Sequence, residues 1–350
     1  MKKKKTNKMK IKNYHILGND TPSDLPKLDN EMVWKDATIS ELSDFLKKYY
    51  CCSDKFRLCY QEDFLNWYLK DSHIVSICSK SGTLIGNIIG AKTTMIIDGV
   101  NCQTAEINLL CVHPIFRSNS KFGLVYKLID ELSRRLFKDG IEKLIYTNTE
   151  QTKIPKPITS TTYYHRIINC KKLMKYQFCN QYSDRDIEKR KLTKKTSLRL
   201  MKSEEIEQVY ELYCKNTNKI RQYFTLEEFK YKFLSEFIKV YVIEKNNVVT
   251  DFISYYRLDR LVIENKDWIK EGSIYYYYFQ KNSVIHNIIN DLICIMENDG
   301  MDLLSAIDIM DEGFLSLKYK LYFEKGTHLM YYYLLNHKCK KTSDVKYVMY

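Results

Sequence analysis

The sequence predicts a mixed α/β protein, either two domains or one large fold with two halves, built on a mixed sheet flanked by helices. Two observations support this prediction. The hydrophobic patterns run as two helices, several strands, a helix and a strand, and this order recurs after about residue 195. The chain also has 350 residues, of which 45% are hydrophobic, which is enough for two units around a sizeable core.

In the first half, local signals mark the ends of the expected elements. Ser40, with Glu41 in the next position, predicts the start of a helix. Asp98-Gly99 is typical of a two-residue hairpin turn, and Gly140 predicts a helix end. We expect helices over 40–50, 62–70 and 124–138, and strands over 73–79, 83–89, 93–97, 100–112 and 143–147.

The second half repeats the order of elements without evident sequence identity. Ser203 predicts a helix start, and Thr225 with Glu228 forms a capping-box pattern. We expect helices over 203–214, from 225 onward and over 285–298, and strands over 240–244, 248–256, 273–280 and 303–307. The predicted regions are therefore a disordered basic tail over 1–13, an N-terminal half over 14–194 and a C-terminal half over 195–350.

Charge and cysteine content indicate where the protein is located and which kinds of site are absent. The formal net charge is +13, and the first twelve residues hold seven lysines and no acid. Such a run favours a solvated tail, with weak contact to anionic lipid or ribosomal RNA as the alternative. The eleven cysteines include no C-x-x-C pair, which favours a reducing, cytoplasmic location without disulfides or zinc. No stretch approaches the ~20 apolar residues of a membrane span.

The stretch 106–123 is the most informative part of the chain. An apolar strand leads into an Arg-Ser-Asn-Ser-Lys loop, and a long amphipathic helix follows. Backbone N–H groups at a helix N-terminus, beside positive side chains, form a typical site for phosphate groups. The corresponding junction of the second half, over 280–283, is shorter and lacks glycine. We therefore expect only the first half to bind a phosphorylated cofactor.

Several strings in chain order carry a resemblance to known proteins. They are, in the first half, residues 106–113, 117–118, 134–135, 140–141, 146–147, 155–157, 163–166 and 172–173, and in the second half 198–199, 249–252, 306–310 and 332–333. With these strings, and with a strand–phosphate loop–helix order that is typical of GNAT acyl-CoA transferases, the chain resembles the N-myristoyltransferases. The resemblance implies a tandem duplicated GNAT-like fold that binds myristoyl-CoA in one half and a peptide in the other. It further implies transfer of the myristoyl group to an N-terminal glycine amine, with no metal and no acyl-enzyme.

The resemblance also implies a set of catalytic residues. Backbone amides at Leu109 and Leu110 would form the oxyanion hole, although the family usually has Phe where Leu109 stands. The carboxylate of Tyr350 would take the proton of the amine, with Asn108 and Thr147 positioning that amine. From the residues alone, two leucines in a strand indicate core packing, and a chain end is usually frayed.

By the same resemblance, residues that bind acyl-CoA and peptide can be named. The predicted acyl-CoA residues are Tyr14, Leu110, Cys111, Val112, Arg117, Ser118, Asn119, Ser120, Lys121, Phe122 and Gly123. The predicted peptide residues are Tyr49, Tyr50, Tyr163, His165 and Asp308. A histidine beside tyrosines is otherwise a structural histidine.

The chain departs from the family pattern at residues 51–54, where an acidic run is replaced by Cys-Cys-Ser-Asp. We therefore expect a weaker preference for Lys or Arg downstream of the glycine. Two alternatives stay open: another tandem GNAT-like transferase, such as one using aminoacyl-tRNA, or an acyl-CoA or peptide binder that has lost turnover. We expect a monomer.

Overall fold

The structure is a computed structural model and describes residues 24–50, 55–117, 123–149, 151, 156–281, 285–309, 321–334 and 344–350. Several predictions fall outside these ranges. They concern the basic tail over 1–13 with its proposed lipid or RNA contacts, the segment 51–54, and the acyl-CoA residues Tyr14, Ser118, Asn119, Ser120, Lys121 and Phe122.

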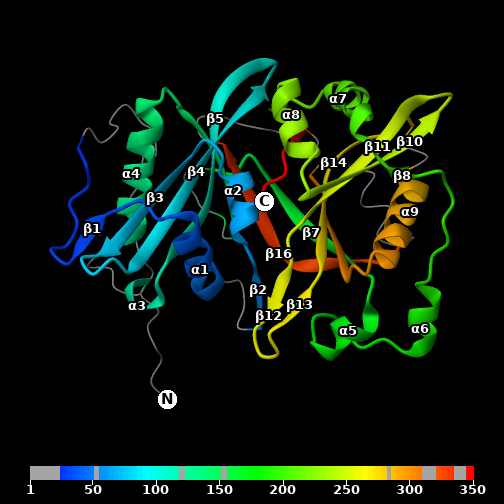
Figure 1. The fold of residues 1–350 in the computed structure, drawn as a ribbon, viewed down its shortest axis with the longest axis horizontal. Coiled ribbons are helices and arrows are strands. Elements are labelled where there is room, and N and C mark those ends of the chain that lie inside the picture. Colours follow the sequence, from blue (N-terminus) through cyan, green and yellow to red (C-terminus); the bar gives the residue numbers. More distant parts are fainter. Residues whose placement is uncertain are drawn as a thin grey trace.

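One large mixed sheet runs through the centre of the molecule (Figure 1). Its strand order is β1-β3-β4-β5-β6-β16-β7-β15-β14-β11-β10-β8, with β9 pairing β4 and β17 pairing β9. The strands are β1 (Met32–Trp34), β3 (Ser72–Ser79), β4 (Leu84–Ile97), β5 (Val100–Val112), β6 (Lys143–Asn148), β7 (Thr159–Ile167), β8 (Arg199–Leu200), β9 (Ile220–Tyr223), β10 (Ile238–Lys245), β11 (Val248–Arg257), β14 (Glu271–Tyr278), β15 (Leu303–Ile307), β16 (Phe323–Leu334) and β17 (Val345–Lys346). A small second sheet contains β2 (Phe56–Leu58), β12 (Arg260–Val262) and β13 (Asp267–Ile269).

The pairing pattern of the first half recurs in the second. Strands β3, β4 and β5 pair antiparallel and β5 pairs parallel with β6; β10, β11 and β14 pair antiparallel and β14 pairs parallel with β15. Each half then sends one strand across, because β16 lies between β6 and β7, and β7 lies between β16 and β15. The predicted mixed α/β fold with a repeated order is confirmed, while the division at residues 194 and 195 stays a prediction.

Helices flank the sheet in both halves (Figure 1). They are α1 (Ile39–Tyr49), α2 (Glu62–Tyr68), α3 (Pro114–Arg117), α4 (Leu124–Lys138), α5 (Cys170–Lys175), α6 (Asp184–Lys189), α7 (Ile206–Cys214), α8 (Leu226–Phe233) and α9 (Ile285–Asn298), with a 3₁₀ turn over Ser203–Glu205 before α7. Glycines let two of them approach the sheet closely. A Cβ on Gly90 would lie 2.8 Å from Leu132 of α4, and one on Gly272 would lie 2.7 Å from Met296 of α9.

Most predicted boundaries agree with the structure within a few residues, and three predictions were wrong. Ser203 caps no helix, because it is the first residue of the 3₁₀ turn, whose cap is Lys202. A single strand, β4, replaces the two strands expected over 83–89 and 93–97, because Gly90 accommodates α4 and does not interrupt the strand. The cap of α1 is Thr38, whose hydroxyl accepts from the Glu41 N–H while the Glu41 carboxylate accepts from the Thr38 N–H. Ser40 instead donates a hydrogen bond to Glu62.

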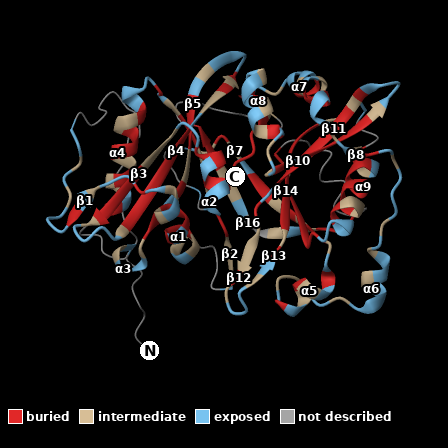
Figure 2. Ribbon diagram, viewed as in Figure 1, coloured by how far each residue is buried: buried red, intermediate tan, exposed pale blue. Residues whose placement is uncertain are grey.

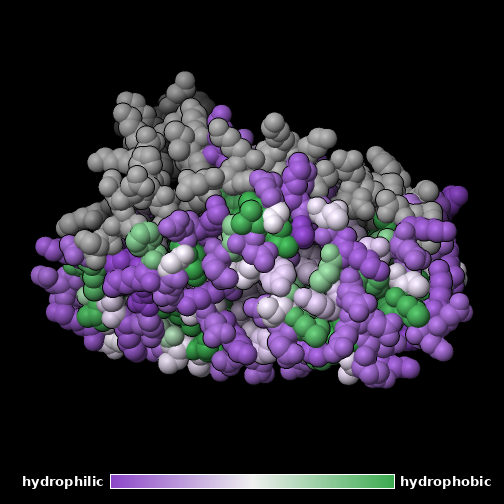
Figure 3. All heavy atoms as spheres, turned by 90° about the horizontal axis from the view of Figure 1, so that it is seen from above, coloured by the Kyte–Doolittle hydropathy of each residue, from purple (hydrophilic) through white to green (hydrophobic). Residues whose placement is uncertain are grey.

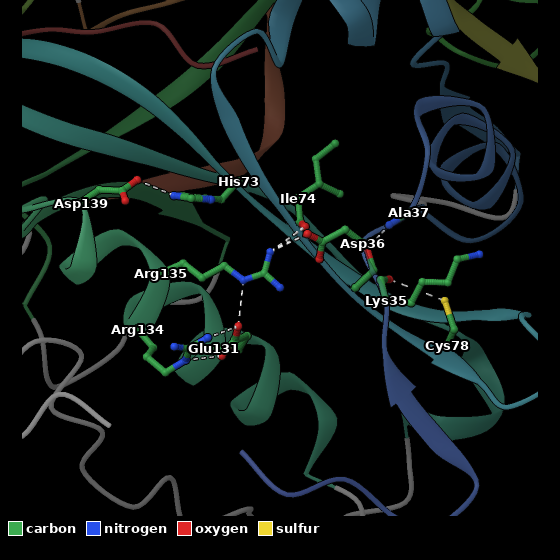
Figure 4. A network of polar contacts seen from close by, with 11 residues as sticks. Lys35, Asp36, Ala37, His73, Ile74, Cys78, Glu131, Arg134, Arg135 and Asp139 are labelled. Carbon is green, nitrogen blue, oxygen red and sulfur yellow. Dashed lines mark hydrogen bonds and ion pairs between the residues drawn. The ribbon is translucent and has the colours of Figure 1, made fainter. Parts of the chain in front are cut away.

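A buried carboxylate orients two arginines of α4, and one of them ties the helix to the segment before α1 (Figure 4). Glu131 is almost fully buried and accepts hydrogen bonds from Arg134 and Arg135, at 2.7–2.8 Å. Arg135 also reaches Asp36, ahead of α1, at 2.7 Å. Burial alone would raise the pKa of Glu131, but the two arginines hold that pKa below its usual value.

The last residues of the sequence run through the middle of the main core (Figure 2). Val345, Tyr347, Val348 and Met349 are all buried, and Lys346 donates to the Asn216 side chain at 2.6 Å and to the Tyr277 carbonyl at 3.0 Å. These contacts place Tyr350 beside the sheet and not at the periphery.

The surface seen in Figure 3 is mostly hydrophilic, with hydrophobic residues in small separate groups between the polar ones. Such scattering is ordinary for a protein surface. Among the described residues, no helix is long and apolar enough to cross a membrane.

Candidate active site

A bulge in β5 places the backbone of Leu109 and Leu110 at the wall of a cavity. In the β4–β5 ladder, Asn87 pairs with Cys111 and Ile89 with Asn108, so two residues of β5 oppose Ile88 alone. Leu109 has a φ of +50°, a left-handed conformation that non-glycine residues adopt at a cost. An extra residue of this kind leaves the regular ladder and bends the strand.

Two asparagine side chains hold the bulge. Asn87 donates from Nδ2 to the Leu109 carbonyl at 2.7 Å, and the Leu109 N–H donates to Asn108 Oδ1 at 2.8 Å. The side chain of Leu109 is buried, whereas that of Leu110 is partly exposed and lines the cavity. The local strain is thus balanced by hydrogen bonds to polar side chains within a sheet.

The end of the sequence lies beside this bulge. Asn108 donates from Nδ2 to the backbone oxygen of Tyr350 at 2.9 Å. The Tyr350 ring is enclosed by aromatic rings at centroid distances of 5.0–5.9 Å, those of Phe64, Trp67, Tyr68, Tyr256 and Tyr275. These rings pack around the Tyr350 side chain, while Tyr350 as a whole stays partly exposed at the cavity wall.

Behind Asn108 lies a buried carboxylate that sequence reasoning did not single out. Glu106 accepts hydrogen bonds from the hydroxyls of Tyr68 at 2.5 Å and Tyr347 at 2.7 Å, and from Asn108 Nδ2 at 3.3 Å. Burial raises the pKa of Glu106. Glu106 and Asn108 are two residues apart on one strand, so they share a face of the sheet. Two polar residues at this spacing in an otherwise apolar strand are the sequence feature from which Glu106 could have been predicted as part of the site.

The cavity has a volume of about 700 Å³ and brings most predicted catalytic and peptide residues together. Its walls include Tyr50, Asn108, Leu109, Leu110, Thr147, Tyr163, His165 and Tyr350. They come from the segment after α1 and from β5, β6, β7 and the chain end, so segments from both halves meet here.

A polar cluster closes one part of the cavity. His165 Nδ1 lies 2.8 Å from Ser305 Oγ, which donates to the buried carboxylate of Glu271. Burial lowers the pKa of His165, which favours the neutral imidazole at pH 7. Burial alone would raise the pKa of Glu271, but the ion pair with Arg260 holds that pKa below its usual value.

Two predicted peptide residues do not line this cavity. The Tyr49 carbonyl accepts a hydrogen bond from Arg117 at 2.6 Å, and its ring packs edge-on against His113. Asp308 accepts hydrogen bonds from the Thr161 hydroxyl and from the Thr162 N–H. The carboxylates on the wall are instead those of Glu271 and Glu324.

The predicted acyl-CoA residues continue from the bulge towards α4. The side chains of Cys111 and Val112 are buried, and the Arg117 Nε donates to the Val112 carbonyl at 2.6 Å. Gly123 begins α4 with a φ of +53°, without a side-chain cap and without an acidic residue in the first turn. In contrast, α1 and α8 each have a capping box with glutamate. The α4 N-terminus therefore suits an external anion.

No group of three metal-ligating side chains occurs in the part of the chain that the structure describes.

Asn87 offers a direct test of the bulge. We expect Asn87→Ala to lower stability by about 1–3 kcal/mol, because the buried Leu109 carbonyl loses its partner. Turnover should fall about tenfold, because the backbone at Leu109 and Leu110 is free to shift. Thermal unfolding and steady-state kinetics measure both effects, with the exposed Asn101→Ala as a control. Unchanged unfolding and turnover in Asn87→Ala would contradict the structural role.

Solved structures with the same fold indicate the class of protein. Yeast (Saccharomyces cerevisiae) N-myristoyltransferase with bound myristoyl-CoA matches with a TM-score of 0.84 at 25% identity, over 95% of this chain and 87% of that one. A second structure of the yeast enzyme, with myristoyl-CoA and inhibitors, matches with a TM-score of 0.85. The fold and the cavity therefore define an α/β acyltransferase.

Sequence comparison gives the family. The chain matches the N-terminal domain of myristoyl-CoA:protein N-myristoyltransferase over residues 18–161 and the C-terminal domain over 174–348. The glycylpeptide N-tetradecanoyltransferase of Plasmodium falciparum (isolate 3D7) is 30% identical over 330 residues, covering 88% of this chain and 78% of that protein. The enzyme of Saccharomyces cerevisiae is 30% identical over 328 residues, covering 81% and 70%. The chain belongs to the myristoyl-CoA:protein N-myristoyltransferase family, and its acyl donor is myristoyl-CoA.

Proposed function

We propose that this protein transfers the myristoyl group from myristoyl-CoA to the N-terminal glycine amine of substrate proteins by direct attack of the amine. The observation that carries the proposal is the 2.9 Å contact between Asn108 Nδ2 and the Tyr350 backbone oxygen. In a chain that ends at Tyr350, this contact puts a carboxylate next to the bulge at Leu109 and Leu110, inside the cavity.

The amine is the group that the site must activate. A glycine α-amine has a pKa of ~8, so most of it is protonated at pH 7 and cannot attack. A carboxylate in water is a poor base. Removal from water disfavours the charged ammonium and carboxylate relative to the neutral amine and carboxylic acid, so proton transfer from the amine to the carboxylate becomes easier. The aromatic rings around the Tyr350 side chain give its carboxylate an apolar surrounding on one side, and Asn108 and Thr147 border the same cavity.

The acyl transfer itself needs a site for developing negative charge. The amine nitrogen forms a bond to the thioester carbon, the carbon–sulfur bond breaks, and CoA leaves as the thiolate. The proton that the attacking nitrogen must lose to become an amide passes to this thiolate, so the products are the amide and the CoA thiol. The carbonyl oxygen is negative in between, and fixed backbone N–H donors stabilise it; losing one such donor typically costs ~10²–10³ in rate. We assign these donors to the backbone N–H groups of Leu109 and Leu110. Because the Leu109 N–H donates to Asn108 Oδ1 at 2.8 Å, this assignment requires that hydrogen bond to break when the thioester binds.

The α4 N-terminus and Arg117 are assigned to the CoA phosphates. The uncapped first turn of α4 attracts an anion, and Arg117 lies on the strand-to-helix connection that leads to it. Tyr50, Tyr163 and His165 line the cavity on the side assigned to the peptide. Monomeric state and cytoplasmic location stay predictions.

Mass spectrometry tests the reaction. A glycine-starting peptide with myristoyl-CoA and the protein should gain one 14-carbon acyl group, and the same peptide with an acetylated amine should gain none. Calorimetry with myristoyl-CoA measures cofactor binding separately. Binding without any adduct would overturn the proposal in favour of an acyl-CoA binder.

A further inference from the structure

Helix α8 of the second half packs next to α2 and the chain end (Figure 1). The Tyr231 hydroxyl donates to the Trp67 carbonyl at 3.2 Å, and the Lys70 ammonium lies over the Tyr231 ring, 4.2 Å from its centroid. The next residue, Lys232, is half-buried, and its ammonium lies over the rings of Trp67 and Tyr350, 5.1 and 5.6 Å from their centroids. Two aromatic faces thus hold a cation beside the chain end.

The Lys232 ammonium is not neutralised by a direct partner. Within the described ranges it makes no ion pair and donates no hydrogen bond, whereas Lys230 of the same helix pairs with Glu207 at 2.8 Å. The carboxylates that act on Lys232 through their charge are Glu106 of β5 and, more weakly, Glu228 of α8. Burial lowers the pKa of Lys232 to about 8, so the ammonium still carries its charge at pH 7.

The hydrogen bonds of Glu106 suit an ionised carboxylate. Its Oε1 accepts from the Tyr68 hydroxyl and from Asn108 Nδ2, and its Oε2 accepts from the Tyr347 hydroxyl. Protonation would turn one of these oxygens into a donor, and the NH₂ group of Asn108 has no acceptor to offer it. Since the same NH₂ group donates to the Tyr350 backbone oxygen, the place of the chain end depends on the charge of Glu106.

Burial opposes this charge, because it raises the pKa of Glu106. In a chain that ends at Tyr350, the terminal carboxylate adds a second negative charge beside Asn108. Apart from Lys232, the titratable side chains that act on Glu106 from the other described elements are tyrosines, which are neutral at pH 7: Tyr68 of α2, Tyr276 of β14, Tyr332 of β16, and Tyr347 and Tyr350 at the chain end. The positive charge of Lys232 lowers the pKa of Glu106 and so favours the ionised form.

We propose that Lys232 is a positioning residue of the acyl transfer, because its charge keeps Glu106 ionised. An ionised Glu106 holds the Nδ2 group of Asn108, which in turn holds the Tyr350 backbone oxygen. The inference rests on the proposed function, in which the chain end is the base. Among the described residues Lys232 is not part of the cavity wall, so its charge acts through Glu106 and not on the peptide.

The pH dependence of acylation tests this role. Lys232→Met removes the positive charge, so Glu106 should ionise only at a higher pH. The kcat/KM of the variant for a glycine-starting peptide is divided by that of the unmodified protein at each pH, which cancels the titration of the peptide amine. We expect this ratio to be within about twofold of one near pH 8.5 and about five- to tenfold lower near pH 6.

Three further variants separate the charge of Lys232 from its packing. Lys232→Arg keeps the charge and should give a ratio that does not change with pH. Lys230→Met, which removes a lysine of the same helix, is the matched control and should behave in the same way. Lys232→Met combined with Glu106→Gln should show no pH-dependent loss relative to Glu106→Gln alone. A loss that is equal at every pH, or a pH-dependent loss that persists without the Glu106 carboxylate, would overturn the proposal.

A measurement without turnover separates this proposal from the proposed function. With carbon-13 in the glutamate carboxyl groups, the NMR signal that is missing in Glu106→Gln belongs to Glu106, and its titration gives the pKa of this residue. That pKa should rise by about one unit in Lys232→Met and stay the same in Lys230→Met. An unchanged pKa in Lys232→Met would overturn the role of Lys232 even if acylation is fast. A raised pKa in a protein that acylates no peptide would support the action of Lys232 on Glu106 and contradict the proposed reaction.

Discussion

Replacing the terminal carboxylate of Tyr350 with a carboxamide is expected to lower kcat by about 10²–10⁴-fold, the usual contribution of a general base. The affinity for myristoyl-CoA should stay within about twofold, because the assigned phosphate site at the α4 N-terminus is formed by other residues. The change is nearly isosteric. The amide oxygen can still accept the hydrogen bond from Asn108 Nδ2, so the ring and backbone of Tyr350 keep their contacts.

Intein cleavage provides both forms of the chain from one precursor. Release with ammonia gives the amide, and release by thiolysis followed by hydrolysis gives the acid as the matched control. Single-turnover acylation of a glycine-starting peptide then measures the chemical step. If the amide form were as fast as the acid form, the base would have to be another group. A slow amide form with weakened myristoyl-CoA binding would point to a general structural defect.

The elements that the sequence predicted well are those with a complete local pattern. The helix over 124–138 has leucines at Leu124, Leu128, Leu132 and Leu136 on one face and a glycine at its end, and the structure has α4 with the same bounds. The Asp98-Gly99 turn likewise has positive φ at both residues. In such segments the local signal and the tertiary packing favour the same structure.

Strands β7 and β16 were not predicted, and their position explains why. Each of these strands pairs with strands of the other half, whose residues are more than 100 positions away in the sequence. Polar residues such as Thr161 and Thr162 in β7 are buried by this pairing, so no clear alternation marks the strand. Contacts between distant segments determine whether these strands form, and a single sequence carries little information about such contacts.

The site shows the same division. Resemblance predicts roles for Asn108, Leu109, Leu110, Thr147 and Tyr350, and the structure brings these residues to one cavity although they come from distant parts of the chain. Their catalytic roles stay predictions. The resemblance did not identify Asn87, Tyr68 or Tyr347, which act through hydrogen bonds between elements and belong to no local motif. Asp308 lies within a matching string, but its carboxylate accepts hydrogen bonds from Thr161 and Thr162 of β7 and it does not line the cavity, so its role in peptide binding stays a prediction.

Glu106→Gln is the second substitution with a large expected effect. The carboxylate accepts from Tyr68, Tyr347 and Asn108 at once, and a carboxamide would direct an N–H group at one of these donors. We expect stability to fall by about 1–3 kcal/mol. We also expect kcat to fall about 10- to 100-fold with little change in KM, because Asn108 and the chain end would shift by a fraction of an ångström.

Glu131→Gln is the matched control for loss of a buried carboxylate. The Glu131 side chain is as little exposed as that of Glu106, but its hydrogen bonds within the described part of the chain go to Arg134 and Arg135 of its own helix, α4 (Figure 4). Its replacement should lower the unfolding temperature and leave kcat unchanged.

Tyr347→Phe removes one of the hydrogen bonds to Glu106 and should have a smaller effect on kcat than Glu106→Gln. If both glutamate variants lost stability equally and turnover equally, Glu106 would be only a structural residue. A loss of kcat confined to Glu106→Gln and Tyr347→Phe would mean that the network positions the chain end for catalysis.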